Sequence, residues 1–182
     1  IHPLLPGRAN SLAAADISVA PQRKLKMADV EGQVRGFMGR HPDVLRVDPA
    51  SLRLDPARSQ SVGNGRVWFL ELQQFYKGVP VEGANVFFRI NNGNLVQFGA
   101  DRVGDVKVQM VPRSDGPRRF REMLAALGLT RAQLSEILDA GTLKIYPTLT
   151  SDETPGQAFR GAKGAGYSHT LVWEFVFRRQ ND

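Results

Sequence analysis

The chain has 182 residues, of which 42% are hydrophobic and 23% charged, and these values are ordinary for a globular protein with its own core. It contains no cysteine, which excludes disulfides, thiolate metal sites and cysteine nucleophiles. No apolar run in the sequence approaches the roughly 18 residues that a membrane-spanning helix needs.

The net charge of +6 and the isoelectric point near 10.1 raise the question of nucleic-acid binding. Basic and acidic residues are interleaved along the whole chain, and the densest basic run is Arg118, Arg119 and Arg121. Three arginines on one helix are typical of a solvated surface rather than of a track for phosphates. We therefore expect no nucleic-acid partner.

The first residues, IHPLLPGRANSLAAAD, lack the charged and apolar regions of an intact signal peptide. Because the chain opens on Ile1 rather than on Met, we expect it to begin inside a longer precursor, or after processing. Residues 1–26 are rich in Pro, Gly and Ala and are expected to form a loosely ordered leader.

A first folded module is expected over residues 27–111. Its opening helix is predicted to begin behind Asp29 as N-cap and to end near Gly39. The run RVWFLELQQFY, residues 66–76, predicts a strand, and KGVPVEGA, residues 77–84, predicts a turn. The apolar positions of the helix recur at helical spacing at Val30, Val34, Phe37 and Met38.

A β-hairpin is predicted around Asn92-Gly93, since the two central residues of a type I′ turn need positive φ angles. In the register that this turn sets, Ile90 faces Leu95 and Phe87 faces Phe98. Both faces of the resulting sheet carry apolar residues. One face needs a helix of the chain as cover, and the other needs a second cover or a partner.

A second module is expected over residues 112–182. It begins with a helix that has Pro117 near its start and Gly128 as its stop. A second helix is predicted over residues 130–141 behind a capping box of Thr130 and Gln133. TLKIYPT predicts a strand, residues 151–166 a long loop, and YSHTLVWEFVFR a half-buried closing strand with an aromatic stripe.

Together these patterns predict an α+β fold of two small modules, each an antiparallel sheet packed on a helix, that meet near residue 111. The sequence shows no internal repeat.

The histidines give no sign of a metal site. None of His2, His41 and His169 belongs to an HExxH arrangement or to another spacing typical of metal ligands. We expect His41 to lie at a helix end, and His169 to be a hydrogen-bonded, partly buried imidazole on the closing strand. No GxSxG nucleophile elbow is present either.

The segment GQAFRGAK, residues 156–163, is only superficially similar to a phosphate-binding loop. No Ser or Thr follows Lys163, and Gly-Ala-Gly stands where the helix of such a loop would begin. The carboxylates Glu71, Glu82 and Glu174 are predicted on different strands, and the sequence leaves open whether folding brings two of them together. We therefore expect no enzymatic activity, no metal and no cofactor in this chain.

The stretch from residue 73 to residue 101 resembles the FTP motif. That module is the N-terminal half of propeptides of fungalysin- and thermolysin-type zinc metalloproteases. The residues that carry the resemblance are Gln74, Tyr76, Gly78, Val79, Pro80, Val81, Gly83, Ala84, Asn92, Gly93 and Gly99.

Residues 112–178 more loosely resemble the PepSY module, which follows the FTP module in those propeptides. Here the resemblance rests on a strand over 143–146 and on Leu171 and Trp173 in the closing strand. Together the FTP-like module, residues 27–111, and the PepSY-like (cystatin-like) module, residues 112–182, cover most of the chain.

The resemblance implies a propeptide that acts in cis on the zinc metalloprotease catalytic domain that follows it. Such a propeptide assists the folding of that domain, remains bound to it non-covalently and inhibits it, without holding zinc itself. It implies a secreted or periplasmic location, reached after removal of a signal peptide that this chain does not contain. The signature residues are expected to be fold determinants before partner contacts.

Two other functions stay open at this stage. One is a free-standing extracytoplasmic binding or protease-inhibitory module that uses the same folds. The other is an enzyme, which would need a carboxylate pair or a histidine in a cleft.

Overall fold

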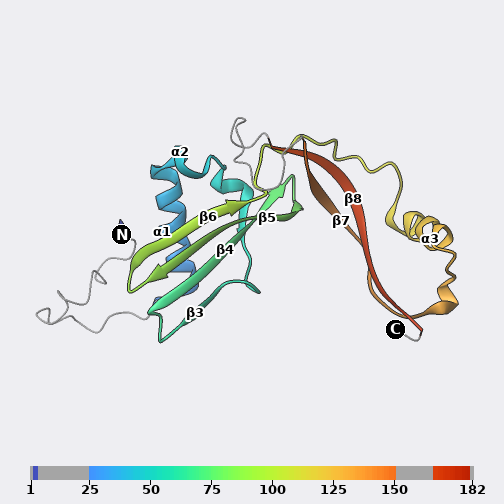
Figure 1. The fold of residues 1–182 in the computed structure, drawn as a ribbon, viewed down its shortest axis with the longest axis horizontal. Helices are drawn as coiled ribbons and strands as arrows, with labels where there is room; N and C mark the ends of the chain where they lie inside the picture. The colour runs from blue at the N-terminus through green and yellow to red at the C-terminus, as the bar shows by residue number, and fades with distance from the viewer. Residues whose placement is uncertain (1, 4–24, 151–165, 181–182) are drawn as a thin grey trace, which may run out of the picture. The chain divides into compact units, whose positions relative to one another are not determined.

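The computed structural model describes residues 2–3, 25–150 and 166–180, of which 47% lie in strands and 25% in helices. Figure 1 shows their arrangement. The elements are β1 (His2–Pro3), α1 (Met27–Arg40), α2 (Pro42–Leu45), η1 (Pro49–Ser51), β2 (Leu52–Leu54), β3 (Gln60–Val62), β4 (Val67–Tyr76), β5 (Val79–Asn91), β6 (Asn94–Asp101), α3 (Gly116–Ala126), η2 (Arg131–Gln133), β7 (Leu134–Leu149) and β8 (Tyr167–Arg179).

Three predictions fall on residues that lie wholly or mostly outside the described ones. These are the leader over residues 1–26, the loop over residues 151–166, and the GQAFRGAK segment at 156–163 within it.

The strands form one mixed sheet rather than two separate antiparallel ones. Its main path has the order β1-β6-β5-β4-β2, and β3 pairs with β4. β7 pairs with β8 in antiparallel register and also with β5 in parallel, at Val81 opposite Ile145. The expected fold class of two modules, each an antiparallel sheet packed on a helix, is therefore wrong, because β5 pairs with strands on both sides of the expected boundary.

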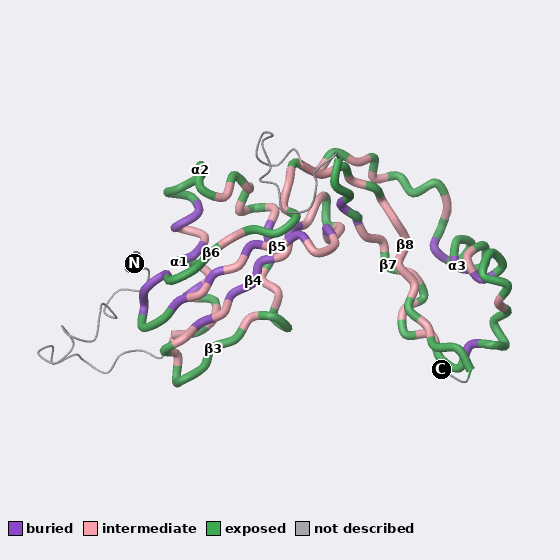
Figure 2. The backbone as a smooth tube through the Cα atoms, viewed as in Figure 1, coloured by how far each residue is buried: buried purple, intermediate pink, exposed green. Residues whose placement is uncertain are grey.

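The described residues divide into two compact units. Gly83–Asp105 and the residues up to Phe75 belong to the first unit. Tyr76–Glu82 and the residues from Val106 onward belong to the second. Figure 2 shows buried backbone along α1, β4 and β5, whereas β7 and β8 are mostly intermediate or exposed.

Helix α1 covers the buried face of the first unit's sheet. It ends at Arg40, close to the predicted end. The prediction of Asp29 as the N-cap is wrong. Lys26 holds that position, and its backbone N–H donates to Asp29 Oδ2 at 2.8 Å. The predicted apolar set is confirmed, since the buried residues of α1 are Val30, Val34, Phe37 and Met38, packed in one cluster with Leu70, Leu72, Val86 and Phe88.

The predicted hairpin turn joins β5 and β6. Asn92 and Gly93 have φ angles of 47° and 80°, as a type I′ turn requires. The predicted pairing of Ile90 with Leu95 is confirmed, and both side chains are buried in the core of the first unit.

The predicted pairing of Phe87 with Phe98 is wrong. The register shifts just beyond Ile90, where β6 carries one extra residue, Val96. Phe98 therefore faces Phe88, with ring centroids 6.1 Å apart and ring planes 18° apart. A single bulge thus moves Phe98 to the side of the sheet where Phe88 is buried.

The predicted turn over residues 77–84 is shorter than expected. Lys77 and Gly78, with φ angles of 47° and 85°, reverse the chain by themselves, and Val79 already begins β5. Because two residues with positive φ are enough to connect adjacent antiparallel strands, the valines that follow are free to pair. Gly83 retains a positive φ of 67° inside the strand.

In the second unit, the predicted helix over residues 130–141 is wrong. Thr130 N–H does donate to Gln133 Oε1 at 2.8 Å, but the capping box opens only a single 3-10 turn. Leu134 already begins β7, which pairs with β8 along its length. Pairing with a strand distant in sequence has overridden a helical pattern of apolar residues.

Helix α3 agrees with its prediction. Asp115 is its N-cap, and its Oδ1 accepts the backbone N–H of Arg118 at 2.7 Å. Phe120 and Leu124 are buried, and the ring of Phe120 lies 5.1 Å from that of Phe175 on β8. The helix thus packs its apolar side on the ribbon formed by β7 and β8.

Gly99 offers a test of the packing between β5 and β6 in the first unit. It pairs with Phe87, and a Cβ at this position would lie 2.7 Å from Cζ of Phe87. We expect Gly99→Ala to lower the free energy of unfolding by about 1–2 kcal/mol in urea denaturation. Gly32→Ala is the matched control, since nothing lies within 4 Å of that exposed helical position. This control should gain roughly 0.5–1 kcal/mol. Equal stability of the two variants would contradict the steric role of Gly99.

Candidate functional site

The residues of the FTP resemblance occupy turns, strands and local hydrogen bonds. Gln74 is 5% exposed, and its side chain exchanges two hydrogen bonds with the backbone of Gly104, at 2.9 and 3.3 Å. The ammonium of Lys77 lies 5.3 Å from the ring centroid of Tyr76. The other members lie in the two turns and in β5 and β6, at Gly78, Val79, Pro80, Val81, Gly83, Ala84, Asn92, Gly93 and Gly99.

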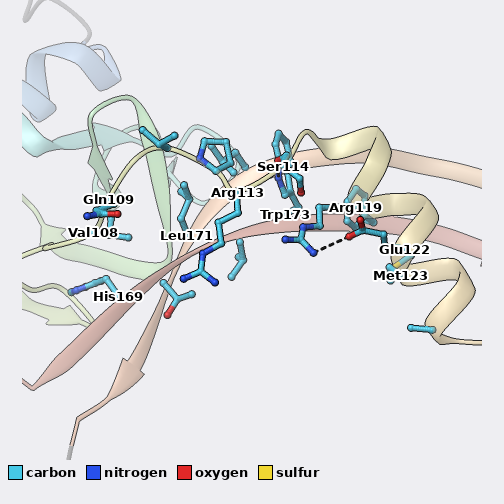
Figure 3. Close-up of a pocket in the computed structure, with 17 residues that line it drawn as sticks. Val108, Gln109, Arg113, Ser114, Arg119, Glu122, Met123, His169, Leu171 and Trp173 are labelled. Carbon is cyan, nitrogen blue, oxygen red and sulfur yellow. Dashed lines mark hydrogen bonds and ion pairs between the residues drawn. The ribbon is translucent and has the colours of Figure 1, made fainter.

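The two residues of the PepSY resemblance, in contrast, lie together in a groove of the second unit (Figure 3). The groove has a volume of about 920 Å³ and is bounded by residues 108–114, α3 and β8. Its apolar lining includes Leu171 and Trp173, along with Val108, Met123, Leu143 and Phe175.

The indole of Trp173 holds the groove together. Its Nε1–H donates to the backbone carbonyl of Ser114 at 3.1 Å. A Cβ on Gly116 would lie 3.2 Å from the Trp173 ring, so the first residue of α3 approaches the indole closely. Trp173 therefore fixes the start of α3, and the chain leading into it, against β8.

Two polar atoms in the groove are buried and have no hydrogen-bond partner among the described residues, namely Ser114 Oγ and His169 Nε2. The prediction of a hydrogen-bonded imidazole at His169 is therefore wrong for Nε2. Burial lowers the pKa of His169, since it disfavours the charged imidazolium.

The charged residues of the groove are two arginines and one glutamate. Arg119 forms an ion pair with Glu122 at 2.8 Å, drawn as a dashed line in Figure 3. A hydrogen bond from Arg118, with support from Arg119, keeps the pKa of Glu122 below its usual value. Arg113 forms no ion pair within the described part of the chain. Among the described residues, Arg113 is therefore the arginine of the groove lining that has no ion pair.

Folding brings two of the predicted carboxylates to one lysine. Lys144 Nζ lies 2.9 Å from Glu82 and 2.5 Å from Glu174, which lie on the strands on either side of β7. Burial lowers the pKa of Lys144, but its hydrogen bonds to both glutamates outweigh burial, and the net shift is upward. Glu71 instead pairs with Arg89. These carboxylates are engaged in ion pairs, which is not the arrangement of a general acid facing a general base.

No group of three or more His, Asp or Glu residues that could hold a metal ion occurs in the ranges that the structure describes. The described helices are also too short or too polar for any of them to cross a membrane.

Sequence reasoning missed the wall of the groove formed by residues 108–114. In the sequence that segment indicates only the boundary between the two modules. Its signal was the alternation of Val106, Val108 and Met110 with Lys107 and Gln109, which is typical of an extended chain with one apolar side.

Comparison with protein-family models, with curated proteins and with solved structures finds no match to this chain. The resemblance to FTP and PepSY propeptides therefore rests on the residues quoted above and stays a prediction.

The lysine between the two glutamates can be tested by Lys144→Met. Without the ammonium, Glu82 and Glu174 repel each other across β7, and we expect the free energy of unfolding to fall by about 1 kcal/mol, given their partial exposure. Lys107→Met is the control, since Lys107 is exposed and forms no ion pair in the described ranges. Urea denaturation at low and high salt measures both variants. A loss that does not shrink at high salt would contradict the electrostatic cause.

The lowered pKa of His169 predicts a pH dependence of stability. The folded state favours the neutral imidazole, so its contribution is complete above the unfolded pKa of about 6.5 and is lost as pH falls below that value. His169→Gln removes this titration. The variant should lose less stability than the parent chain between about pH 7 and pH 5, measured by thermal unfolding. Parallel pH profiles would show that His169 does not titrate in this way.

Proposed function

We propose that this chain is the non-catalytic propeptide of a secreted zinc metalloprotease, and that it assists the folding of the catalytic domain and inhibits it. The observation that carries the proposal is the set of large apolar side chains that are exposed on the β7–β8 ribbon. Its exposed fractions are 53% for Leu138, 48% for Tyr146, 56% for Leu149 and 41% for Val176. Large apolar side chains that remain exposed along one element are typical of a surface that a partner protein covers.

The difference in burial between the two units supports the same proposal. In the first unit α1 and the sheet enclose a cluster of fully buried residues, whereas none of the residues of β8 is fully buried. A strand that is apolar but only half-buried gains stability when a second protein covers it. In this proposal the first unit is a scaffold, and the ribbon and groove of the second unit contact the enzyme.

A propeptide of this kind affects the partner by binding to its native-like surface. Binding to the folded catalytic domain, and not to its unfolded chain, favours the folded state by mass action. The same contacts close the cleft of the enzyme to substrate. The zinc ion and the catalytic groups then belong to the partner, and the location is extracytoplasmic, as the family resemblance implies.

The alternative is a free-standing extracytoplasmic module that binds or inhibits a protease encoded elsewhere. One observation favours it, namely that the groove is built from residues of the second unit alone and needs no covalently attached domain to form.

The test has two steps. The coding sequence beyond Asp182 is read for a catalytic domain with an HExxH motif, and the purified chain is then titrated against that domain while peptide hydrolysis is followed. We expect saturable inhibition, and a faster recovery of activity when the denatured enzyme refolds with the chain present. Absence of both effects, or absence of a protease gene with an HExxH motif, would overturn the propeptide proposal.

Substitutions on the ribbon show whether it makes the contact. Tyr146→Asp should weaken inhibition by about tenfold or more, because it places a charge in an apolar interface. Leu127→Asp is the matched control, since Leu127 is 58% exposed but lies at the end of α3 rather than on the ribbon. An equal effect of the two substitutions would contradict a contact through the ribbon.

A further inference from the structure

The outer side of β8 is an open sheet edge. Among the described residues β8 pairs with β7 alone, from Tyr167 opposite Leu149 to Arg179 opposite Leu134. The half between Tyr167 and Glu174 pairs in unbroken register, and it contains neither proline nor lysine. Proline, lysine and breaks in register are the features that usually protect an edge strand from adding another strand. This edge therefore presents a row of backbone N–H and C=O groups to any extended chain beside it.

The groove lies along that edge. Five consecutive residues of β8, His169, Thr170, Leu171, Val172 and Trp173, line it. Successive side chains of a strand point to opposite faces, and the lining combines His169, Leu171 and Trp173 of one face with Thr170 and Val172 of the other, so the groove borders the strand itself as well as the face that carries Trp173. Its far wall is the extended segment 108–112, which belongs to no strand. The groove is thus bordered by β8 and by this extended segment, with residues of α3 and Leu143 of β7 also in its lining.

The charge of the groove indicates what such a strand would carry. Arg113 lines the groove and forms no ion pair with any described residue. Much of the remaining lining is apolar. We propose that the groove binds an extended peptide with alternating apolar and acidic side chains, which adds as a strand to the edge of β8 and places a carboxylate at Arg113.

Other occupants fit the same observations less well. A second copy of this chain would bring together two proteins that each carry a net charge of +6, with Arg113 of both near the contact. A nucleic acid would need several cations along the groove, whereas its lining in the described residues contains two arginines, Arg113 and Arg119, of which Arg119 is paired with Glu122. An acidic peptide satisfies both the backbone groups of the edge and the free guanidinium.

The experiment uses the full chain and synthetic heptapeptides, with binding measured by calorimetry. The probe is the acetylated and amidated peptide Val-Glu-Val-Glu-Val-Glu-Val. Two further versions carry N-methyl groups either on the interior valines or on the glutamates, which leaves the side chains unchanged and removes alternate backbone donors. One of these two should bind about tenfold or more weakly, because alternate N–H groups of a strand point to one neighbour. Failure of the unmodified probe to bind, or equal affinity of all three peptides, would overturn strand addition.

A charge exchange tests the role of Arg113. Arg113→Glu should weaken binding of the glutamate peptide by about tenfold and favour the peptide in which lysine replaces glutamate. Arg121→Glu is the control, with the same change of charge on α3 but outside the groove lining. If both variants respond alike, the preference comes from net charge and the proposed contact is wrong.

Sedimentation of the chain alone separates a second copy from a peptide. A monomer that binds the probe supports the proposal, whereas a concentration-dependent dimer that fails to bind it overturns the proposal in favour of self-association. The inference does not require the partner to be a protease. Because no protease is present in these assays, their failure leaves the inhibition test of the proposed function unaffected.

Discussion

The groove of the second unit depends on the indole of Trp173. One hydrogen bond from its Nε1 to Ser114 and one close approach to Gly116 hold the entry of α3 against β8. The segment before α3 has no strand partner of its own, so this anchor determines where it runs. The aromatic contacts of Phe120 with Phe175 and Phe177 then hold the rest of the helix on the same strand. Without this anchor the groove loses the wall formed by residues 108–112, and that segment no longer covers β8.

The sequence predicted the elements whose causes are local. Helix α1 follows from its apolar spacing, α3 from Pro117 near its start and Gly128 beyond its end, and the β5–β6 turn from Asn92-Gly93. The errors came from interactions between distant residues. The extra residue at Val96 changes which phenylalanines face each other, and pairing with β8 turns a helical pattern after Thr130 into a strand. The mixed sheet itself rests on a parallel pairing for which no local pattern exists.

The candidate site was predictable only in part. Leu171 and Trp173 were singled out through a family resemblance, and both lie in the groove. Arg113 and Ser114 were not, because a residue becomes part of a pocket through neighbours that only the fold supplies. His169 was expected to be a hydrogen-bonded, partly buried imidazole, whereas its Nε2 is buried without a partner among the described residues. The alternation of residues 106–110 was visible in the sequence, but an extended segment without a paired partner gives no indication of what it faces.

The ion pairs of Lys144 on β7 limit which substitutions are tolerated at positions 82, 144 and 174. Lys144 pairs with one carboxylate from the strand on each side, so the charges at three positions on three strands depend on one another. Loss of the positive charge at position 144 leaves two carboxylates without their shared counter-ion, and loss of one glutamate leaves the other still paired. Substitutions at positions 82 and 174 are therefore tolerable one at a time, whereas a substitution at 144 needs both to change. Among related sequences these three positions should vary as a group, with the lysine changing last.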